Sequence, residues 1–436
     1  MSNRKTVYVA ISSDILHRGH LNVLEQAARL GEVTVGLLTD SAIATYKRAP
    51  LLDWETREAT IANMRQVSRV VPQDTLSYAQ NIRDFRPDFV VHGDDWRTGI
   101  QSVVRAEVLN LLSEYGGELV EIPHTVGVSG TDLEAAFRPT ASTTDSRRAQ
   151  LRRLLKMKPW LRAIEASNGL SALIVENVKV DDPENGAVRE YDAMWVSSLC
   201  DSTFKGKPDT ELVDFTSRLR TIHDIMEVST KPIILDGDTG GRAEHFPHMI
   251  RTLERVGVSA VIIEDKTGLK QNSLFGTDAV QTLDDPREFA IKLNTGKRAQ
   301  VSDDFMIIAR LESLIAGLGV DDAIMRAKIY IEQGGADGIM IHSRHKDGEE
   351  IREFMRRFRE YTTEIPVIVV PTTYNHIPES ELAEMGASIV IHANHLLRSA
   401  YPAMLDTATR ILENGRSLEV DDELMSIKDV LKLIPE

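Results

Sequence analysis

Short apolar runs alternate with longer amphipathic segments along the whole chain. The first run, TVYVAI at residues 6–11, is rich in β-branched residues and is typical of a buried parallel strand. A polar turn follows, and then GHLNVLEQAARLG at residues 19–31, which has helical periodicity and ends on a glycine. Further strands are expected at residues 33–38, around Phe89 and around Val120. The pattern predicts an N-terminal α/β domain of the doubly wound, Rossmann-like type.

A second series of apolar runs follows, with helical segments between its members. Eight strand–helix repeats in fewer than 300 residues point to a (β/α)8 TIM-type barrel. The runs begin at Ser171, Ala193, Ile233, Ala260, Phe305, Gly338, Pro366 and Ser388. Charged residues stand at the ends of several runs, where barrel enzymes have their active sites. These residues are Asp236, Asp238, Glu264, Asp265, Arg310, Glu312 and His342.

A polar stretch separates the two series. RPTASTTDSRRAQ, at residues 138–150, contains a proline and a Ser/Thr run and shows no periodicity. We interpret it as an interdomain linker. The expected domains are therefore residues 1–137 and residues 151–436, and the last stretch, from Ser417, is expected to be acidic and helical.

Composition narrows the classes of function. The chain has 436 residues and carries 51 Lys and Arg against 66 Asp and Glu, a net charge of −15 that disfavours nucleic acid and anionic membrane as partners. Cys200 is the only cysteine, which excludes an intrachain disulfide and fits a reducing compartment. No stretch approaches the roughly 20 apolar residues of a membrane span. We expect a cytoplasmic protein.

Two histidines three residues apart mark the first candidate site. His17, Gly19 and His20 stand in SSDILHRGH, where the first expected strand meets the first expected helix. Backbone N–H groups and the helix dipole favour phosphate at such a junction, and a glycine lets the phosphate approach closely. The alternative is a surface turn with two solvated histidines.

The HxGH motif, together with GDDW at residues 93–96, resembles the cytidylyltransferase branch of the nucleotidyltransferase superfamily over nearly all of residues 5–135. The resemblance implies that His17 and His20 hold the triphosphate of CTP while the α-phosphorus is attacked, with Lys47 assisting. Pyrophosphate would leave. The nucleotide-binding residues implied by the resemblance are Ser12, His17, Gly19, His20, Lys47, Asp94, Trp96 and Ser129.

The closing motif of that family is altered here. Residues 124–130 are HTVGVSG, where the family usually has Arg-Thr-Glu-Gly-Ile-Ser-Thr. The change removes an arginine and a hydroxyl that bind phosphate, although Ser129 could still donate at a helix start. A second hypothesis therefore stays open, in which the N-terminal domain binds CTP as a sensing or scaffolding module without transferring CMP.

Acidic residues mark the second candidate site. Asp236 and Asp238 in LDGDTGG are two apart and so lie on the same side of an extended chain. With Glu264 from the next strand end, three carboxylates would converge to bind Mg²⁺, which retains several waters. The segment EDKTGLKQNSLFG, at residues 264–276, has a composition suited to a mobile lid over a phosphorylated anion. The alternative is a salt-bridged barrel rim.

EDKxxxKxNS resembles the hallmark of phosphoenolpyruvate mutase in the isocitrate lyase superfamily, and the likeness covers about residues 150–415. It implies Mg²⁺-dependent interconversion of phosphoenolpyruvate and 3-phosphonopyruvate. The metal ligands it implies are Asp236, Asp238 and Glu264. The substrate would be cradled by Trp195, Ser197, Ser198 and Leu199. The catalytic residues would be Asp209, Lys270, Asn272, Ser273, Arg310 and His342, with His17 and His20 in the N-terminal domain.

The two resemblances together imply a fused enzyme of phosphonate biosynthesis. The barrel would form the carbon–phosphorus bond, and the N-terminal domain would attach CMP to a phosphonate such as 2-hydroxyethylphosphonate or 2-aminoethylphosphonate. Enzymes of antibiotic and of phosphonolipid biosynthesis share this plan. The rival for the barrel is phosphonopyruvate hydrolase, against which the Asn272–Ser273 pair argues. The family also implies a homo-oligomer, a dimer or tetramer, formed by exchange of a C-terminal helix.

Overall fold

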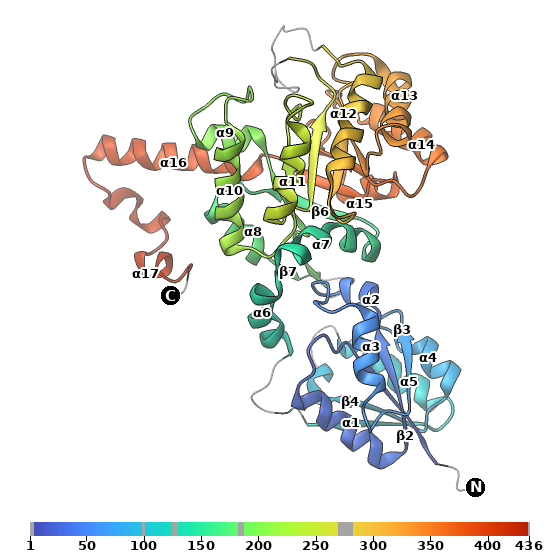
Figure 1. The fold of residues 1–436 in the computed structure, drawn as a ribbon. Coiled ribbons are helices and arrows are strands. Elements are labelled where there is room, and N and C mark those ends of the chain that lie inside the picture. The colour runs from blue at the N-terminus through green and yellow to red at the C-terminus, as the bar shows by residue number, and fades with distance from the viewer. Residues whose placement is uncertain are drawn as a thin grey trace.

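A computed structural model of the chain shows two α/β units joined by two helices, α6 (Gly130–Ala141) and α7 (Thr144–Met157) (Figure 1). The unit at the N-terminus contains a five-stranded sheet, and the second unit contains a closed barrel. The structure describes residues 4–97, 101–123, 125, 130–181, 187–268 and 282–434.

The N-terminal sheet is parallel and its strand order is β3-β2-β1-β4-β5. This order is the one of a doubly wound fold, so the Rossmann-like prediction is confirmed. Apolar clusters cover both faces of the sheet. The strands are β1 (Thr6–Ile11), β2 (Glu32–Leu38), β3 (Arg69–Gln73), β4 (Phe89–Gly93) and β5 (Glu118–Ile122). The helices are α1 (Arg18–Leu30), α2 (Asp40–Ala44), α3 (Trp54–Ala62), α4 (Ala79–Phe85) and α5 (Gln101–Ser113), with a 3₁₀ turn η1 (Asp94–Arg97).

The second unit is a closed barrel of eight parallel strands, each followed by a helix, so the TIM-type prediction is also confirmed. In chain order the strands are β6 (Leu161–Glu165), β9 (Ala193–Val196), β10 (Ile233–Asp236), β11 (Ala260–Glu264), β12 (Met306–Leu311), β13 (Gly338–Ile341), β14 (Val367–Val369) and β15 (Ile389–His392). The helices are α8 (Gly169–Asn177), α9 (Ser198–Phe204), α10 (Phe215–Val228), α11 (Phe246–Val256), α12 (Pro286–Ala299), α13 (Gly319–Glu332), α14 (Glu349–Tyr361), α15 (Glu379–Glu384) and α16 (His395–Asn414). A short hairpin, β7 (Val180–Asp181) with β8 (Val188–Arg189), follows α8.

The first barrel strand differs from the prediction. The apolar run that begins at Ser171 belongs to helix α8, and the strand is the preceding segment LRAIE, β6. A capping box starts the helix, because Asn168 Oδ1 accepts from the Ser171 amide at 2.8 Å and Ser171 Oγ accepts from the Asn168 amide at 3.2 Å. The prediction of a strand from Ser171 was therefore wrong, while the other seven expected strands are present.

The expected irregular linker at residues 138–150 is helical: it contains the end of α6 and the first half of α7. Thr143 caps α7 by accepting from the Ser146 amide. Leu151 and Leu154 project from α7 into the apolar cluster that fills the barrel interior, which Ala49 of the N-terminal unit also joins. Because the first half of α7 is polar apart from Ala149 and its other apolar residues lie in the second half, residues 138–150 show little periodicity. Helix α7 closes one end of the barrel.

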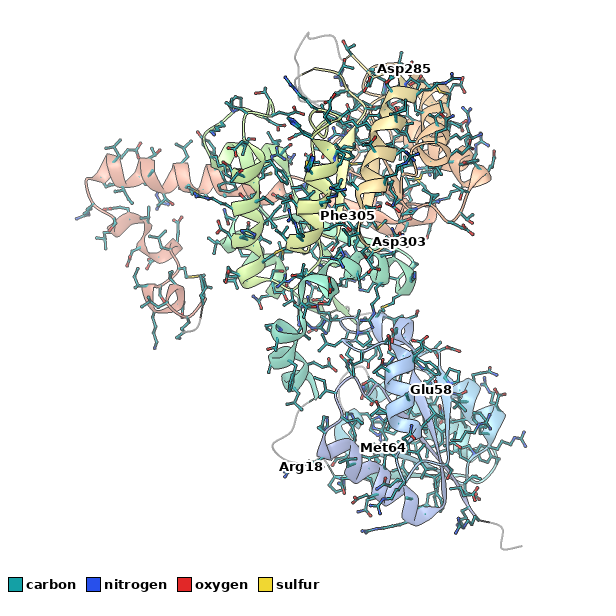
Figure 2. The ribbon with its side chains drawn as sticks, viewed as in Figure 1. Arg18, Glu58, Met64, Asp285, Asp303 and Phe305 are labelled. Atoms are coloured by element: carbon teal, nitrogen blue, oxygen red, sulfur yellow. The ribbon has the colours of Figure 1, made fainter. Side chains whose placement is uncertain are left out.

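The closed end is the amino end of the barrel strands. Phe305 directly precedes β12 and lies toward the N-terminal unit, whereas Asp285, which caps α12 after the preceding strand, lies at the opposite end (Figure 2). The carboxyl ends of the strands therefore point away from the N-terminal unit.

Helix α16 extends away from the barrel, and none of its residues is buried (Figure 1). Two short turns follow it, η2 (Leu418–Glu423) and α17 (Ile427–Val430). Apolar side chains remain exposed along this arm, among them Leu412 at 85% and Ile427 at 76%. Within the described ranges, no helix is both long and apolar enough to cross a membrane.

Replacing Leu151 with alanine is expected to destabilise the barrel by about 2–5 kcal/mol, because the side chain is fully buried and leaves a cavity in the barrel floor. The measurement is the free energy of unfolding in urea, followed through the barrel transition. Leu170→Ala, in α8 and 59% exposed, is the control and should change little. A loss no larger than that of the control would contradict the placement of α7.

Candidate active sites

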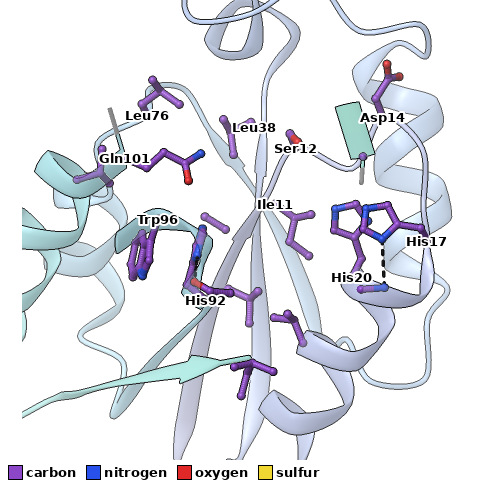
Figure 3. A pocket seen from close by; sticks show the side chains of 18 of the residues that line it. Ile11, Ser12, Asp14, His17, His20, Leu38, Leu76, His92, Trp96 and Gln101 are labelled. Carbon is purple, nitrogen blue, oxygen red and sulfur yellow. Dashed lines mark hydrogen bonds between the residues drawn. The ribbon is translucent and has the colours of Figure 1, made fainter. Parts of the chain in front are cut away.

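A cavity of about 360 Å³ opens at the carboxyl end of the N-terminal sheet. Figure 3 shows His17 and His20 on one side of it and the rings of His92 and Trp96 on the other, with Ile11 between them. Six of the eight expected nucleotide-binding residues line this cavity: Ser12, His17, Gly19, His20, Lys47 and Trp96. Asp94 begins η1 beside it, and Ser129 lies outside the described residues, as do His124 and Val126–Val128.

The histidine pair is built around the start of α1. His17 caps the helix, since its Nδ1 accepts from the Gly19 amide at 3.1 Å, and its ring stacks on that of His20 with centroids 4.0 Å apart. A Cβ at residue 19 would lie 2.8 Å from His17 Cε1, so any other residue there would displace this imidazole. Gly130, the first residue of α6, approaches the same imidazole: a Cβ there would lie 3.3 Å from His17 Nε2. The arrangement aims a helix N-terminus and two imidazoles into one cavity.

His20 is held neutral. Burial, with the positive charges of His17 and Lys47, lowers the pKa of His20 from 6.5 to about 4. Its Nδ1 atom is buried and forms no hydrogen bond with any residue that the structure describes. Such an imidazole can donate a hydrogen bond to a phosphate oxygen that enters the cavity, and the anion would in turn favour its protonation.

Lys47 reaches the same cavity from the segment that follows α2. Its Nζ atom donates to Glu134 Oε1 at 2.9 Å, and Glu134 stands one helical turn after Gly130 on α6. Lysine and carboxylate are both mostly buried. The ammonium group is therefore held in position while it still lines the cavity.

A stacked ring pair forms the opposite wall. The His92 and Trp96 rings lie 3.9 Å apart with an interplanar angle of 9°. Trp96 Nε1 donates to Glu121 Oε1 at 2.9 Å, and Arg97 and Arg105 both donate to the same carboxylate. Hydrogen bonds from Arg105 and Arg97 lower the pKa of Glu121 well below its usual range. A flat aromatic wall of this kind suits a nucleobase.

At the mouth of the barrel, Glu312 forms the centre of a buried charge cluster. Arg310 Nε donates to Glu312 Oε1 at 2.6 Å, and Lys266 Nζ lies 2.9 Å from Glu312 Oε2. His342 Nε2 lies 2.9 Å from Glu312 Oε1 and 3.2 Å from Arg310 Nη2. Burial opposes ionisation of Glu312, yet Arg310 and His342 hold the pKa of its carboxyl well below its usual range. Burial and the charge of Arg310 lower the pKa of His342, so its imidazole is neutral.

Glu264 joins this cluster from the end of β11. Its carboxylate lies 3.4 Å from Arg310 Nη1 and 3.8 Å from Lys266 Nζ, and it is 1% exposed. Asp265, the next residue, points away from the mouth: Tyr330 Oη donates to its Oδ2 at 2.6 Å and the Glu312 amide donates to its Oδ1 at 2.9 Å. Asp265 therefore fixes the backbone of Glu312 from behind.

The DGD motif places its two aspartates differently. Asp236 Oδ2 accepts from Ser198 Oγ at 2.8 Å, whereas Asp238, at φ +53°, forms an ion pair with Arg218 at 2.5 Å. A Cβ on Gly237 would lie 2.7 Å from Val261 Cγ2, so the motif needs its glycine to pack against β11. Asp236 and Glu264 stand at the ends of adjacent strands.

The expected convergence of three carboxylates is not observed. Among the described residues, no group of three or more His, Cys, Asp or Glu side chains is arranged to hold a metal ion. Arg218 pairs with the carboxylate of Asp238, and Asp236 and Glu264 present carboxylate oxygens at adjacent strand ends. Two carboxylates with several retained waters fit Mg²⁺, which takes hard oxygen ligands and rarely needs an all-protein cage.

The remaining expected barrel residues surround this end. Ser197 caps α9 by accepting from the Cys200 amide at 3.4 Å, and Leu199 follows in the first turn. Trp195 is 2% exposed and packs in the barrel interior. Burial raises the pKa of the Cys200 thiol to about 12, with smaller contributions from the charges of Glu165 and of Asp209, which follows α9. Lys270, Asn272 and Ser273 lie outside the described residues.

Comparison with known proteins agrees with this geometry. The family profile described as phosphoenolpyruvate phosphomutase matches residues 151–412, more than half of the chain. The chain belongs to the phosphoenolpyruvate phosphomutase family. A phosphoenolpyruvate phosphomutase of Tetrahymena pyriformis is 35% identical over 302 residues, which cover 69% of this chain and 94% of the relative.

Solved structures are similar to the barrel as well. A phosphoenolpyruvate phosphomutase from Streptomyces platensis subsp. rosaceus has 35% identity and a TM-score of 0.59, covering 66% of this chain and 94% of its own. A phosphonopyruvate hydrolase in complex with oxalate and Mg²⁺ has 32% identity and a TM-score of 0.57, covering the same 66% and 94%.

The N-terminal unit matches a second profile, described as cytidylyltransferase-like, over residues 12–149. The chain is thus a phosphoenolpyruvate phosphomutase family member that carries a cytidylyltransferase-like domain, and isomerase and nucleotidyltransferase activities are supported together.

Three residues of these sites were not predicted as part of them. His92 and Glu121 form the aromatic wall with Trp96, and Glu134 holds Lys47. His92 directly precedes the GDDW motif, so its position was a usable signal. The glutamates gave none, because each meets its partner only through the fold.

The imidazole of His20 is expected to titrate near pH 4 in the ligand-free protein. Because its ordinary pKa is 6.5, the unfolded chain binds this proton more readily, and the folded chain loses stability as pH falls from about 6.5 toward 4. Lys47→Gln removes one of the neighbouring positive charges and should raise the pKa. Proton NMR of the histidine ring signals measures both values; a His20 pKa near 6.5 in the wild type would contradict this geometry.

Glu312→Gln is expected to destabilise the phosphomutase-family barrel by about 3–5 kcal/mol, because Arg310 and Lys266 would stay buried with only the more distant Glu264 carboxylate as a counter-charge. Urea unfolding provides the measurement. The matched control is Glu353→Gln on α14, whose carboxylate pairs with Arg356 in solvent and should leave stability close to that of the wild type.

Proposed function

We propose that the chain catalyses two steps of phosphonate metabolism. The barrel interconverts phosphoenolpyruvate and 3-phosphonopyruvate with Mg²⁺, and the N-terminal domain transfers CMP from CTP to a small phosphonate such as 2-hydroxyethylphosphonate or 2-aminoethylphosphonate. The observation that carries the first proposal is the buried cluster of Lys266, Arg310 and His342 around Glu312 at the barrel mouth, in a member of the phosphomutase family.

In the barrel, Asp236 and Glu264 would hold Mg²⁺, which supplies Lewis-acid stabilisation of the carboxylate and enol oxygens when it is bound. Support comes from the hydrolase relative, which was crystallised with oxalate and Mg²⁺. Ser198 hydrogen-bonds Asp236 and so keeps that carboxylate oriented. The backbone of Ser198 and Leu199 at the start of α9 faces the substrate carboxylate in this proposal.

The phosphoryl group leaves the enol oxygen as its phosphorus–oxygen bond breaks, and a phosphorus–carbon bond then forms at the methylene carbon. Such transfers pass through a loose, metaphosphate-like transition state that positioning and nearby donors stabilise. Arg310 supplies fixed positive charge, and neutral His342 supplies a hydrogen bond. We place Asp209 beside the migrating group, together with Lys270, Asn272 and Ser273. Water must be excluded, because hydrolysis competes with the rearrangement.

In the N-terminal domain, the start of α1 with His17 and His20 would bind the triphosphate, and Lys47 would share its charge. The cytosine would lie against the stacked rings of His92 and Trp96. An oxygen of the phosphonate attacks the α-phosphorus, and pyrophosphate leaves. Neutral His20 can donate to the phosphate from the start and stabilises the charge that develops.

We also propose a homo-oligomer. The apolar side chains along α16 and the turns after it are exposed in a single chain, and a second copy would cover them.

The barrel activity is tested by phosphorus NMR on the full chain with 3-phosphonopyruvate and Mg²⁺. Phosphoenolpyruvate should appear, and Asp236→Asn should slow its formation by about 100-fold or more, because a metal-binding carboxylate is lost. Asp303→Asn, an exposed acid before β12 at the closed end, is the control and should leave the rate unchanged. Pyruvate and inorganic phosphate as the products would instead make the barrel a phosphonopyruvate hydrolase.

The same sample with CTP and an equimolar mixture of the two phosphonates tests the N-terminal domain. A CMP-linked phosphonate signal is expected, and Asp236→Asn should not affect it, because Asp236 belongs to the other site. Bound but intact CTP would show a non-catalytic module and overturn the transfer proposal.

A further inference from the structure

The segment between α2 and α3 lies between the nucleotide cavity and the closed end of the barrel. Two consecutive residues of this segment face opposite ways. Lys47 lines the cavity and pairs with Glu134, whereas Arg48 pairs with the barrel. A side chain that reaches the cavity and one that reaches the barrel floor are thus joined by a single peptide bond.

Arg48 is bound firmly on the barrel side. Its Nη1 donates to Glu176 Oε1 at 2.7 Å, and its Nη2 donates to Thr230 Oγ1 at 2.8 Å. Glu176, from α8, also accepts from Ser229 Oγ at 2.7 Å. Burial opposes its ionisation, but Arg48 and Lys231 lower the pKa of Glu176 to about 2, so it is charged at any physiological pH. The guanidinium and the carboxylate are 19% and 15% exposed, which limits screening by salt.

The backbone around Arg48 is also held from several sides. The Tyr46 carbonyl accepts from the Val188 amide of β8 at 3.2 Å, and the Ala49 carbonyl accepts from Arg138 at 3.1 Å. Arg138 stands four residues after Glu134 on α6, on the same helical face. One face of α6 therefore contacts both the ammonium of Lys47 and the carbonyl two residues later.

We propose that Glu176 is a positioning residue for the nucleotide site: through Arg48, the barrel fixes the backbone that presents Lys47, and the N-terminal domain needs this support to bind the triphosphate of CTP. The inference rests on the proposed nucleotide function. Lysine loses much rotamer freedom when it is fixed on a ligand, and a backbone already held in place reduces the ordering that binding must supply.

The test uses the full chain and its binding of CTP, measured by calorimetry, and the KM for CTP. Glu176→Gln and Arg48→Gln remove the ion pair and keep the side-chain size. Each is expected to raise the Kd and the KM for CTP by about fivefold to tenfold while kcat changes by less than about twofold. Arg48→Lys keeps the charge and should recover most of the affinity. The barrel activity should be unchanged, because neither residue lies at the mouth.

Arg152→Gln is the matched control. Arg152 lies on α7 at the same closed end and pairs with Asp337 at 2.9 Å, within the barrel unit. The Arg152→Gln variant loses an ion pair of similar exposure, and the segment that carries Lys47 is unchanged. The affinity of this variant for CTP should therefore equal that of the wild type.

Three outcomes would overturn the proposal. If Glu176→Gln binds CTP as the wild type does, the ion pair merely joins the domains. If the control weakens CTP binding as much as Glu176→Gln, in proportion to lost thermal stability, the effect is one of folding. If the wild type binds no CTP, the nucleotide function fails as well, which separates that case from the other two.

Discussion

The closure of the barrel by α7 is the constraint on which the rest of the structure depends. An eight-stranded barrel is filled by side chains, and at its amino end Leu151 and Leu154 complete that filling. The polar side of the same helix faces the N-terminal unit, where Arg153 donates to the Leu51 carbonyl and pairs with Asp40. Helix α7 therefore closes the barrel core and also holds the segment that carries Lys47.

Charge is arranged differently in the two cavities. At the barrel mouth, positive groups are buried around Glu312, so a phosphorylated anion would meet charges that are already ordered and poorly screened. In the N-terminal cavity the His20 imidazole is kept neutral by burial and by the positive charges of His17 and Lys47, and the field comes mainly from Lys47 and the start of α1. The buried charges at the barrel mouth suit a transition state with dispersed charge. The N-terminal cavity suits a triphosphate from which pyrophosphate must be released.

Most of the fold could be predicted from the sequence, because buried parallel strands are continuous apolar runs. The exceptions have physical causes. LRAIE carries an arginine within a strand, and the run after Asn168 is apolar yet starts with a capping box, so the first barrel strand was misplaced by one element. Strand β3 contains a proline, which an edge strand tolerates, and so gave no strand signal.

Some residues of the candidate sites could be found from local sequence motifs, and others are brought together only by the fold. His17, His20 and Asp236 belong to local motifs whose spacing carries chemistry, and they were found from the sequence. The pairing of Asp238 with Arg218 depends on helix α10 packing beside β10, which no local pattern encodes, so the sequence alone did not show this ion pair. Glu312 stood among the charged strand ends, but its central place emerges only when β11, β12 and β13 lie side by side.

The direction of the barrel strands has a consequence for metabolite traffic. The open end of the barrel points away from the N-terminal unit, and apolar side chains of the described residues fill the other end, between the two cavities. Under the proposed function, a product of the barrel passes into bulk solvent, where other enzymes can modify it before the N-terminal domain binds it. Because the two units share one chain, they are made in equal numbers. Compounds pass between their two sites by diffusion.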